Sequence, residues 1–337
     1  MRDVIPEEVR GNVVGKRNLL NAVVMAIAMP VFAFFVNKEE RIGYLILAIS
    51  ATLFSILSSL SLLKIEDVPK KSIGALAALR STLSDRNFMK LSWFFFYWNF
   101  VVMLSSPFFS YHLIKNLHVP FSYIGFTSSI GSFISILASW HYSRIADNIG
   151  HKSLLQLGIT TVSITGFIWL FMGEHIYREL MIADAFTSGL GWSAIGISVL
   201  TLPMEVAGGS AVTYFLVYYT LGGLGGLFGA LTGGFIGRLI AAKSFTIGEL
   251  DVWYLQIFFA MCGVLRLFGV KLLDSVRVKR HVPLKKVLAT PLNYIGRRLH
   301  ARYMEMLYVM KKIRANGKRS GKLKRSSSKS DTPSERH

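Results

Sequence analysis

The feature that most constrains this chain is a series of long apolar stretches, each bounded by charged residues, glycine or proline. A helix rises 1.5 Å per residue, so about 20 apolar residues are needed to cross the hydrocarbon core of a bilayer. Transmembrane β-strands are about half that length and alternate in polarity, which these stretches do not. The sequence therefore predicts an all-α polytopic membrane protein. Eight stretches qualify as transmembrane helices: 18–36, 43–63, 91–113, 121–141, 154–173, 180–202, 211–236 and 253–273.

The composition argues against a water-soluble enzyme. Hydrophobic residues make up 52% of the chain and charged residues 17%, whereas soluble domains carry about 25% charged residues. The sequence has no P-loop, no G-x-S-x-G nucleophile elbow and no H-E-x-x-H metal spacing. We therefore expect no enzymatic activity, no cofactor and no bound metal.

Positive charge indicates the orientation. The chain has 38 Lys and Arg against 19 Asp and Glu, and 19 of the basic residues lie in 271–337. Without this tail, the loops on the side of the two termini carry 12 basic residues and the opposite loops carry six. The positive-inside rule therefore places both termini in the cytoplasm, and we expect the protein in the cell membrane.

The basic tail has two parts. Over 292–313, apolar residues recur at spacings of three and four with basic residues between them, which predicts an amphipathic helix. Residues 316–337 are of low complexity and are expected to be disordered. Because residues 316–337 contain no aromatic residue, we expect the basic tail, over 280–325, to bind anionic lipids rather than nucleic acid.

A short pattern occurs twice. Residues 5–11 and 202–208 both read aliphatic-Pro-x-Glu-Val-x-Gly, at an offset of 197 positions. Each copy is expected in a short cytoplasmic loop before a span, and six spans lie between the copies. This spacing is typical of a transporter built from two six-helix halves.

The loop between the fourth and fifth stretches carries a second motif. Residues 146–152 read A-D-N-I-G-H-K, which resembles the D-x-x-G-[RK]-[RK] cytoplasmic signature of the major facilitator superfamily. Asp147, Gly150 and Lys152 match this signature, and His151 departs from it. The segment 184–192 also resembles tenth helices of prokaryotic members.

The resemblance implies a twelve-helix fold in which the eight stretches correspond to helices 5 to 12, so that the first four helices are missing. An internal Met taken as the start, a natural truncation and an N-terminal half supplied in trans all remain open. The implied domains are 1–63, the end of an N-terminal bundle; 64–90, a cytoplasmic linker; 91–273, a C-terminal six-helix bundle; and 274–337, the basic tail.

The signature loop is the expected gating element. Gly150 permits a tight turn, and the Asp147 carboxylate can cap a neighbouring helix N-terminus, which the resemblance places in 211–236. That stretch contains glycines four residues apart, which allow close helix packing, and a serine strip in 121–141 is the expected facing surface. Static packing and a sliding gate both remain open. The glycines are Gly225, Gly229, Gly233 and Gly237; the serines are Ser128, Ser132, Ser135 and Ser139.

Polar side chains within the spans are the candidate contacts for a solute, because burying such groups in lipid is costly. Asp184 lies inside a span, about one turn from its outer end. It is expected either to exchange a proton or bind a cationic group, or to act as a helix N-terminal charge or pair with Arg178 or Arg238. Arg266 is expected to extend towards the cytoplasmic interface. The candidate cavity residues are Tyr97, Asn99, Ser106, Asp184, Ser188 and Trp192.

Two functions remain open at this point. The first is a secondary transporter of the major facilitator type that moves a small solute by alternating access, as a symporter or antiporter, with Asp184 as the candidate proton carrier. The second is a non-transporting, truncated transporter fold that acts as a membrane anchor or sensor through its basic tail.

Overall fold

A computed structural model describes residues 20–21, 23–25, 27–28, 31, 40–62, 75–208, 211–247 and 250–284. The expected first span, 18–36, lies mainly outside these residues. The first copy of the repeated pattern and the expected amphipathic helix at 292–313 also lie outside them. Predictions about those segments therefore stay predictions.

The described part of the chain is an all-α membrane fold with six helices long and apolar enough to cross a bilayer. They coincide with the six stretches expected within 91–273. Helix α2 (Glu40–Leu62) covers the stretch expected at 43–63, but its apolar part, Leu45–Leu60, is shorter than the others. The number eight therefore stays a prediction. The six helices are α4 (Arg86–Tyr111), α5 (Phe121–Ile149), α6 (His151–Leu170), α7 (Tyr177–Val206), α8 (Ala211–Ile240) and α9 (Tyr254–Asp274).

Helix α4 begins inside the expected linker. Asp85 caps it, because its Oδ1 accepts hydrogen bonds from the backbone N–H groups of Asn87 and Phe88 at 3.1 and 3.0 Å. A short helix, α3 (Ala75–Ser84), precedes this cap. At its other end α4 continues into one π-helical segment, η1 (His112–Asn116).

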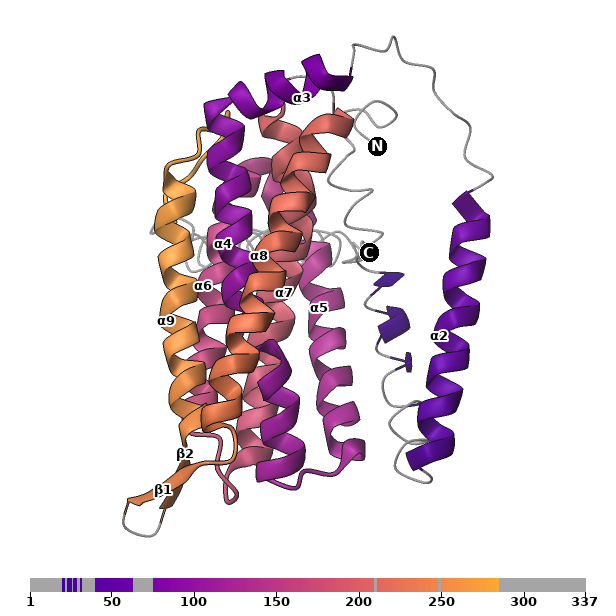
Figure 1. Ribbon diagram of the computed structural model, residues 1–337, viewed down its shortest axis with the longest axis vertical. Helices are drawn as coiled ribbons and strands as arrows, with labels where there is room; N and C mark the ends of the chain where they lie inside the picture. The colour runs from indigo at the N-terminus through magenta and orange to yellow at the C-terminus, as the bar shows by residue number, and fades with distance from the viewer. Residues whose placement is uncertain are drawn as a thin grey trace, which may run out of the picture. The chain divides into compact units, whose positions relative to one another are not determined.

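A small β-hairpin joins α8 to α9. Strands β1 (Ser244–Ile247) and β2 (Leu250–Trp253) pair antiparallel, and Ser244 lies opposite Trp253. The hairpin and α3 lie at opposite ends of the helices (Figure 1). This hairpin is not apparent from the sequence, because its four-residue strands are too short to show a clear alternation of polarity.

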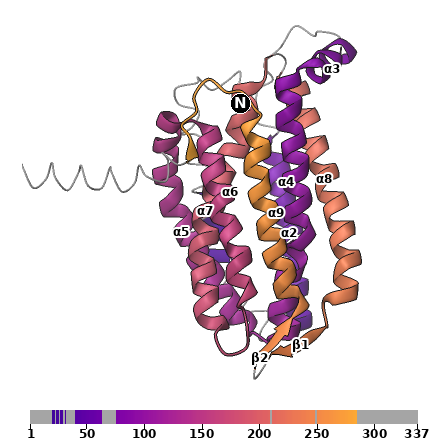
Figure 2. The same cartoon turned by 90° about the vertical axis from the view of Figure 1, so that its left-hand side faces the viewer.

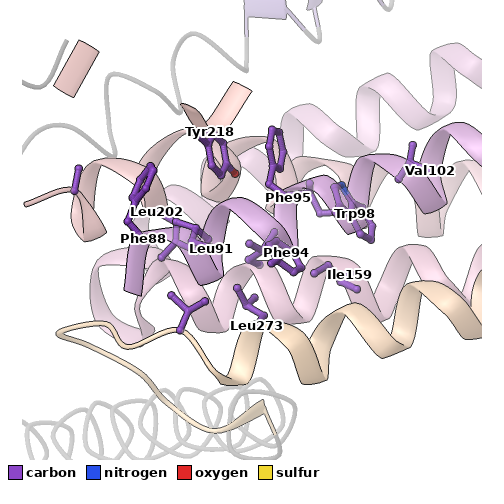
Figure 3. Packing of buried hydrophobic residues seen from close by; sticks show 14 of the residues in the cluster. Phe88, Leu91, Phe94, Phe95, Trp98, Val102, Ile159, Leu202, Tyr218 and Leu273 are labelled. Carbon is purple, nitrogen blue, oxygen red and sulfur yellow. The ribbon is translucent and has the colours of Figure 1, made fainter. Parts of the chain in front are cut away.

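The helices pack in a defined order. Helix α4 packs against α8 and α9, α6 packs against α7 and α9, and α5 packs against α7 (Figures 1 and 2). At the end near α3, buried residues from five helices, α4, α6, α7, α8 and α9, meet in one apolar cluster. Figure 3 shows members of this cluster: Phe88, Leu91, Phe94, Trp98, Ile159, Leu202, Tyr218 and Leu273.

The glycine ladder of α8 lies against α4. A Cβ atom on Gly225, Gly229 or Gly233 would collide with a backbone carbonyl oxygen of α4, and one on Gly237 would collide with the Phe108 ring. The three carbonyls belong to residues 96, 100 and 104, whose spacing of four matches that of the glycines. The two helices therefore run parallel and approach closely, as small residues in membrane helices allow.

The prediction that the serine strip of 121–141 faces this glycine ladder was wrong. The serine strip of α5 does not face it. Instead all four serines line a cavity beside α7, and the Ser139 hydroxyl is 2.8 Å from the Ser193 hydroxyl on α7. Glycine spacing predicts a close approach, but it does not say which helix supplies the matching carbonyls.

Candidate functional site

Two cavities lie between the helices. The larger, of about 590 Å³, is lined mainly by α5 and α7, with the end of α4, Trp169 of α6, and Asn21 and Met25 also contributing. The smaller, of about 200 Å³, lies between α4, α6, α7 and α9. Both cavities share the same five side chains, so those side chains face a common polar and aromatic space. The shared residues are Phe109, Trp169, Asp184, Ser188 and Trp192.

Asp184 is the acidic group of this space. It lies on α7, and the Ser188 hydroxyl, one turn further along the same helix face, donates a hydrogen bond to its Oδ1 at 3.3 Å. The Trp169 indole is the second donor group beside this carboxylate. Two neutral donors therefore stabilise a carboxylate that lies among apolar helices.

Arg266 is the basic group of this space, and its expected extension to the interface was wrong. It lies on α9 with 3% of its surface exposed. Its Nη1 donates to the Val162 carbonyl at 3.3 Å and to the Thr165 hydroxyl at 3.4 Å, and its Nη2 donates to the Ser105 hydroxyl at 3.3 Å. Its Nε has no partner. The face of α9 that carries Arg266 packs against α4 and α6, whose oxygens hold the guanidinium inside the bundle.

The two charges share the smaller cavity without forming a direct ion pair between these described residues. They nevertheless interact, because a low-dielectric interior transmits charge effects over more than contact distance. Arg178, an expected partner of Asp184, lies at the start of α7, where its Nε donates to the Tyr177 hydroxyl at 3.4 Å. The charge that faces Asp184 is therefore Arg266.

The structure places four of the six candidate cavity residues in this space and two elsewhere. Trp192 lines both cavities, and Ser106 lines the smaller one. The Tyr97 hydroxyl instead donates to the Leu265 carbonyl of α9 at 2.7 Å, and the Asn99 amide donates to the Phe95 carbonyl of its own helix at 2.8 Å. The latter two side chains are satisfied by helix packing.

Sequence reasoning missed Thr165 and Trp169 as cavity residues. Both lie in the second half of α6, where no charged residue would have drawn attention to them. Arg266 did carry a signal, since it is a charge inside an apolar stretch, but its helix face could not be assigned from the sequence.

The signature loop forms the junction between α5 and α6. Gly150 has a φ of +88°, and a Cβ there would collide with the Arg280 carbonyl oxygen. The Lys152 ammonium donates to the carbonyls of Asp274 at 3.0 Å and Val276 at 2.9 Å, which is a favourable place for a cation at a helix C-terminus. These contacts of Lys152 go to the end of α9. The side chain of Asp147 lies outside the described residues, so its capping role stays a prediction.

The signature loop is one of several anchors for residues 275–282, which we call the post-α9 segment. The Asn87 amide on α4 both donates to and accepts from the Arg277 backbone, each at 2.8 Å. The Ser153 hydroxyl on α6 donates to the Val282 carbonyl at 2.9 Å and accepts from its N–H at 3.0 Å. The post-α9 segment therefore crosses from α9 to the beginnings of α4 and α6, within the compact unit that ends at Val282.

The second copy of the repeated pattern also contacts the post-α9 segment. Glu205 accepts hydrogen bonds from the backbone N–H groups of Lys279 and Arg280. This copy was expected in a loop, but Pro203 and Glu205 lie in the last turn of α7. Proline is tolerated there because the helix ends within one turn.

His281 is the histidine of the post-α9 segment and lies outside the spans. Its Nδ1 lies 3.1 Å from the Ser153 hydroxyl. Partial desolvation, and next the Lys152 ammonium, lower the pKa of His281, while Asp274 opposes the shift. The attached post-α9 segment therefore favours neutral His281.

These observations define an integral membrane protein with a polar, charged cavity inside a bundle of apolar helices. The sequence profile of the Major Facilitator Superfamily matches residues 1–230. The chain belongs to this superfamily, whose members are membrane transporters of small solutes. A comparison with curated proteins finds no match.

Proposed function

We propose that this major facilitator protein is a secondary transporter that moves a small solute by alternating access, with protons as the coupling ion and Asp184 as their carrier. One observation supports this proposal above the others. A carboxylate and a buried guanidinium line one cavity inside apolar helices. Ionisable groups at such a depth are costly to keep and mark solute or proton pathways.

The chemistry of the pair suits proton coupling. When Asp184 is ionised, its negative charge offsets that of Arg266, and the cavity is neutral. When Asp184 takes up a proton, the positive charge of Arg266 is no longer offset. A solute that interacts differently with these two states is thermodynamically coupled to the proton, because binding one ligand changes the affinity for the other.

The solute contacts that we propose are Ser106, Ser188 and Trp192 together with the charged pair. The serine hydroxyls supply hydrogen bonds, and the indole supplies an apolar wall with one donor. Tyr97 and Asn99 are not among these contacts, because both side chains are occupied between helices.

Alternating access also needs an element that holds one end of the bundle closed. We infer that the signature loop and the post-α9 segment serve this purpose on the cytoplasmic side. Lys152, Ser153, Asn87 and Glu205 tie four helix ends together through one short stretch of backbone. Releasing this stretch would let α4, α6, α7 and α9 separate there as rigid bodies.

We further propose that the protein lies in the cell membrane, that both termini are cytoplasmic, and that residues 280–325 bind anionic lipids. The alternative, a non-transporting anchor or sensor, does not account for a charged pair inside the helices. A helix bundle that only anchors a tail gains nothing from groups that cost free energy to bury.

The test is solute-dependent proton movement in vesicles that contain the purified full chain and an enclosed pH-sensitive dye. A panel of organic acids, amino acids and sugars is added outside, and the internal pH is recorded. We expect at least one solute to change the internal pH, and Asp184→Asn to abolish that change. Solute uptake with an unchanged proton dependence in Asp184→Asn would remove Asp184 from the coupling role.

A further inference from the structure

We propose that the cavity between α4, α6, α7 and α9 takes a small organic carboxylate, whose anionic head pairs with Arg266 and which enters together with one proton on Asp184. The binding step concerns the cavity alone. The transport step rests on the function proposed above, and it names the class of substrate for that function.

Arg266 has the properties of an anion site that is not saturated by the protein itself. A guanidinium carries five N–H donors in a planar fork. The three hydrogen bonds of Arg266 are 3.3 to 3.4 Å long, all go to neutral oxygens, and the Nε makes none. A buried charged donor without an acceptor is costly. A carboxylate is the group whose two oxygens fit an edge of this fork.

The protonation state of Asp184 determines whether the cavity can accept an anion beside Arg266. With Asp184 ionised, an incoming carboxylate would bring a second negative charge against a single guanidinium. With Asp184 protonated, the incoming carboxylate restores a neutral cavity. The balance is therefore one proton and one carboxylate bound together and released together, and no covalent bond other than that of the proton forms or breaks.

The residues that line the cavity indicate the size and polarity of the rest of the ligand. Phe109, Trp169 and Trp192 surround the space, and Val102 closes it on α4. Its volume is about 200 Å³, and a protein cavity of about 150 Å³ is known to hold benzene. The body of the ligand is therefore apolar and about the size of one six-membered ring. The hydroxyl groups of Ser106 and Ser188 can form hydrogen bonds with one hydroxyl or similar polar group of the ligand.

The probes follow from this description. Benzoate, benzamide and benzylamine share one ring and differ in charge, being anionic, neutral and cationic. We would measure binding of each radiolabelled probe to the purified full chain in nanodiscs, at about pH 5.5 and about pH 7.5, where benzoate remains ionised. We expect benzoate to bind at least about tenfold more tightly than benzamide at the lower pH, because a hydrogen bond to a charged group is lost in benzamide.

Three variants separate the roles of the two charges. Arg266→Gln should remove the preference for benzoate over benzamide, whereas Lys271→Gln, which removes the same charge from an exposed position of α9, should leave it intact. Asp184→Asn imitates the protonated acid, so benzoate should bind with equal strength at both pH values. Since Arg266→Gln risks misfolding, Asp184→Asn provides a nearly isosteric test, and each variant is checked by size-exclusion chromatography.

The outcomes distinguish this inference from the proposed function. Tighter binding of benzylamine, or equal effects of Arg266→Gln and Lys271→Gln, would overturn the carboxylate site, even if another solute moves protons in vesicles. Benzoate binding that depends on Arg266 and on pH supports the site even if the same preparation moves no protons, and in that case the proposed function fails. A benzoate affinity in Asp184→Asn that still falls with rising pH would overturn the shared entry of proton and carboxylate.

Discussion

Substituting Gly229 by alanine tests whether the glycine ladder fixes the distance between α8 and α4. A Cβ at this position would collide with the backbone carbonyl group and Cα of Phe100. A backbone in the middle of a helix cannot rotate away, so α4 or α8 must move. Overpacking of this kind typically costs about 1–3 kcal/mol.

The matched control is Gly234→Ala on the same helix. A Cβ there meets no atom within 4 Å. Both substitutions gain the same helix propensity, about 1 kcal/mol for alanine over glycine. The difference between the two variants therefore isolates the collision, about 1–3 kcal/mol, which corresponds to a difference in midpoint of roughly 2–12 °C.

The assay is the thermal unfolding midpoint of each purified variant in the same detergent. We expect Gly234→Ala to match or exceed the unsubstituted protein and Gly229→Ala to unfold at a lower temperature. Equal midpoints for the two alanine variants would refute the close contact between α8 and α4, since the added methyl group would then meet no resistance at Gly229.

Three further predictions concern the post-α9 segment and one helix contact. Lys152→Met should lower stability by about 1.5–3 kcal/mol, because two carbonyls lose a charged donor, and Lys271→Met at an exposed position should not; thermal midpoints decide. The lowered pKa of His281 means that a released segment binds the proton more readily, so attachment is complete above about pH 6.5 and weakens as the pH falls. The protection of 275–282 from hydrogen exchange, measured relative to an unstructured chain at the same pH, should therefore fall on acidification. His281→Gln should flatten this dependence, and protection that does not change with pH would contradict it. Tyr97→Phe should cost about 1 kcal/mol of stability without altering solute affinity, and a change in affinity would place Tyr97 in the site.

The six long helices α4 to α9 were predictable from the sequence because length and apolar composition alone decide them. The packing of these helices against one another was less predictable from the sequence. The spacing of Gly225, Gly229 and Gly233 predicts a close approach, but the matching carbonyls on α4 form a backbone pattern that every helix shares. The serine strip of α5 was equally compatible with a second helix and with a cavity.

The candidate site was predictable where polarity and helix spacing agreed. Asp184 and Ser188 lie one turn apart, and the structure keeps them together. Asn99 and Tyr97 show where such reasoning fails. A polar side chain within a span can satisfy itself on its own helix or on a neighbouring carbonyl, and the sequence does not distinguish these choices.

The position of Arg266 was also not predictable from the sequence. An arginine near a helix end can reach the interface along an apolar surface, and this was the expectation. The oxygens of Ser105, Val162 and Thr165 hold it inside the bundle instead. Only the packing of α9 on α4 and α6 reveals that these acceptors lie within reach.

We propose that Asp184 couples a proton to solute movement, and this coupling can be measured by comparing two transport modes in vesicles that contain Asp184→Asn. Exchange of labelled for unlabelled solute does not require the carrier to release its proton, whereas uphill accumulation driven by a pH gradient does. We expect Asp184→Asn to retain exchange and to lose accumulation. Accumulation at the rate of the unsubstituted protein would contradict it.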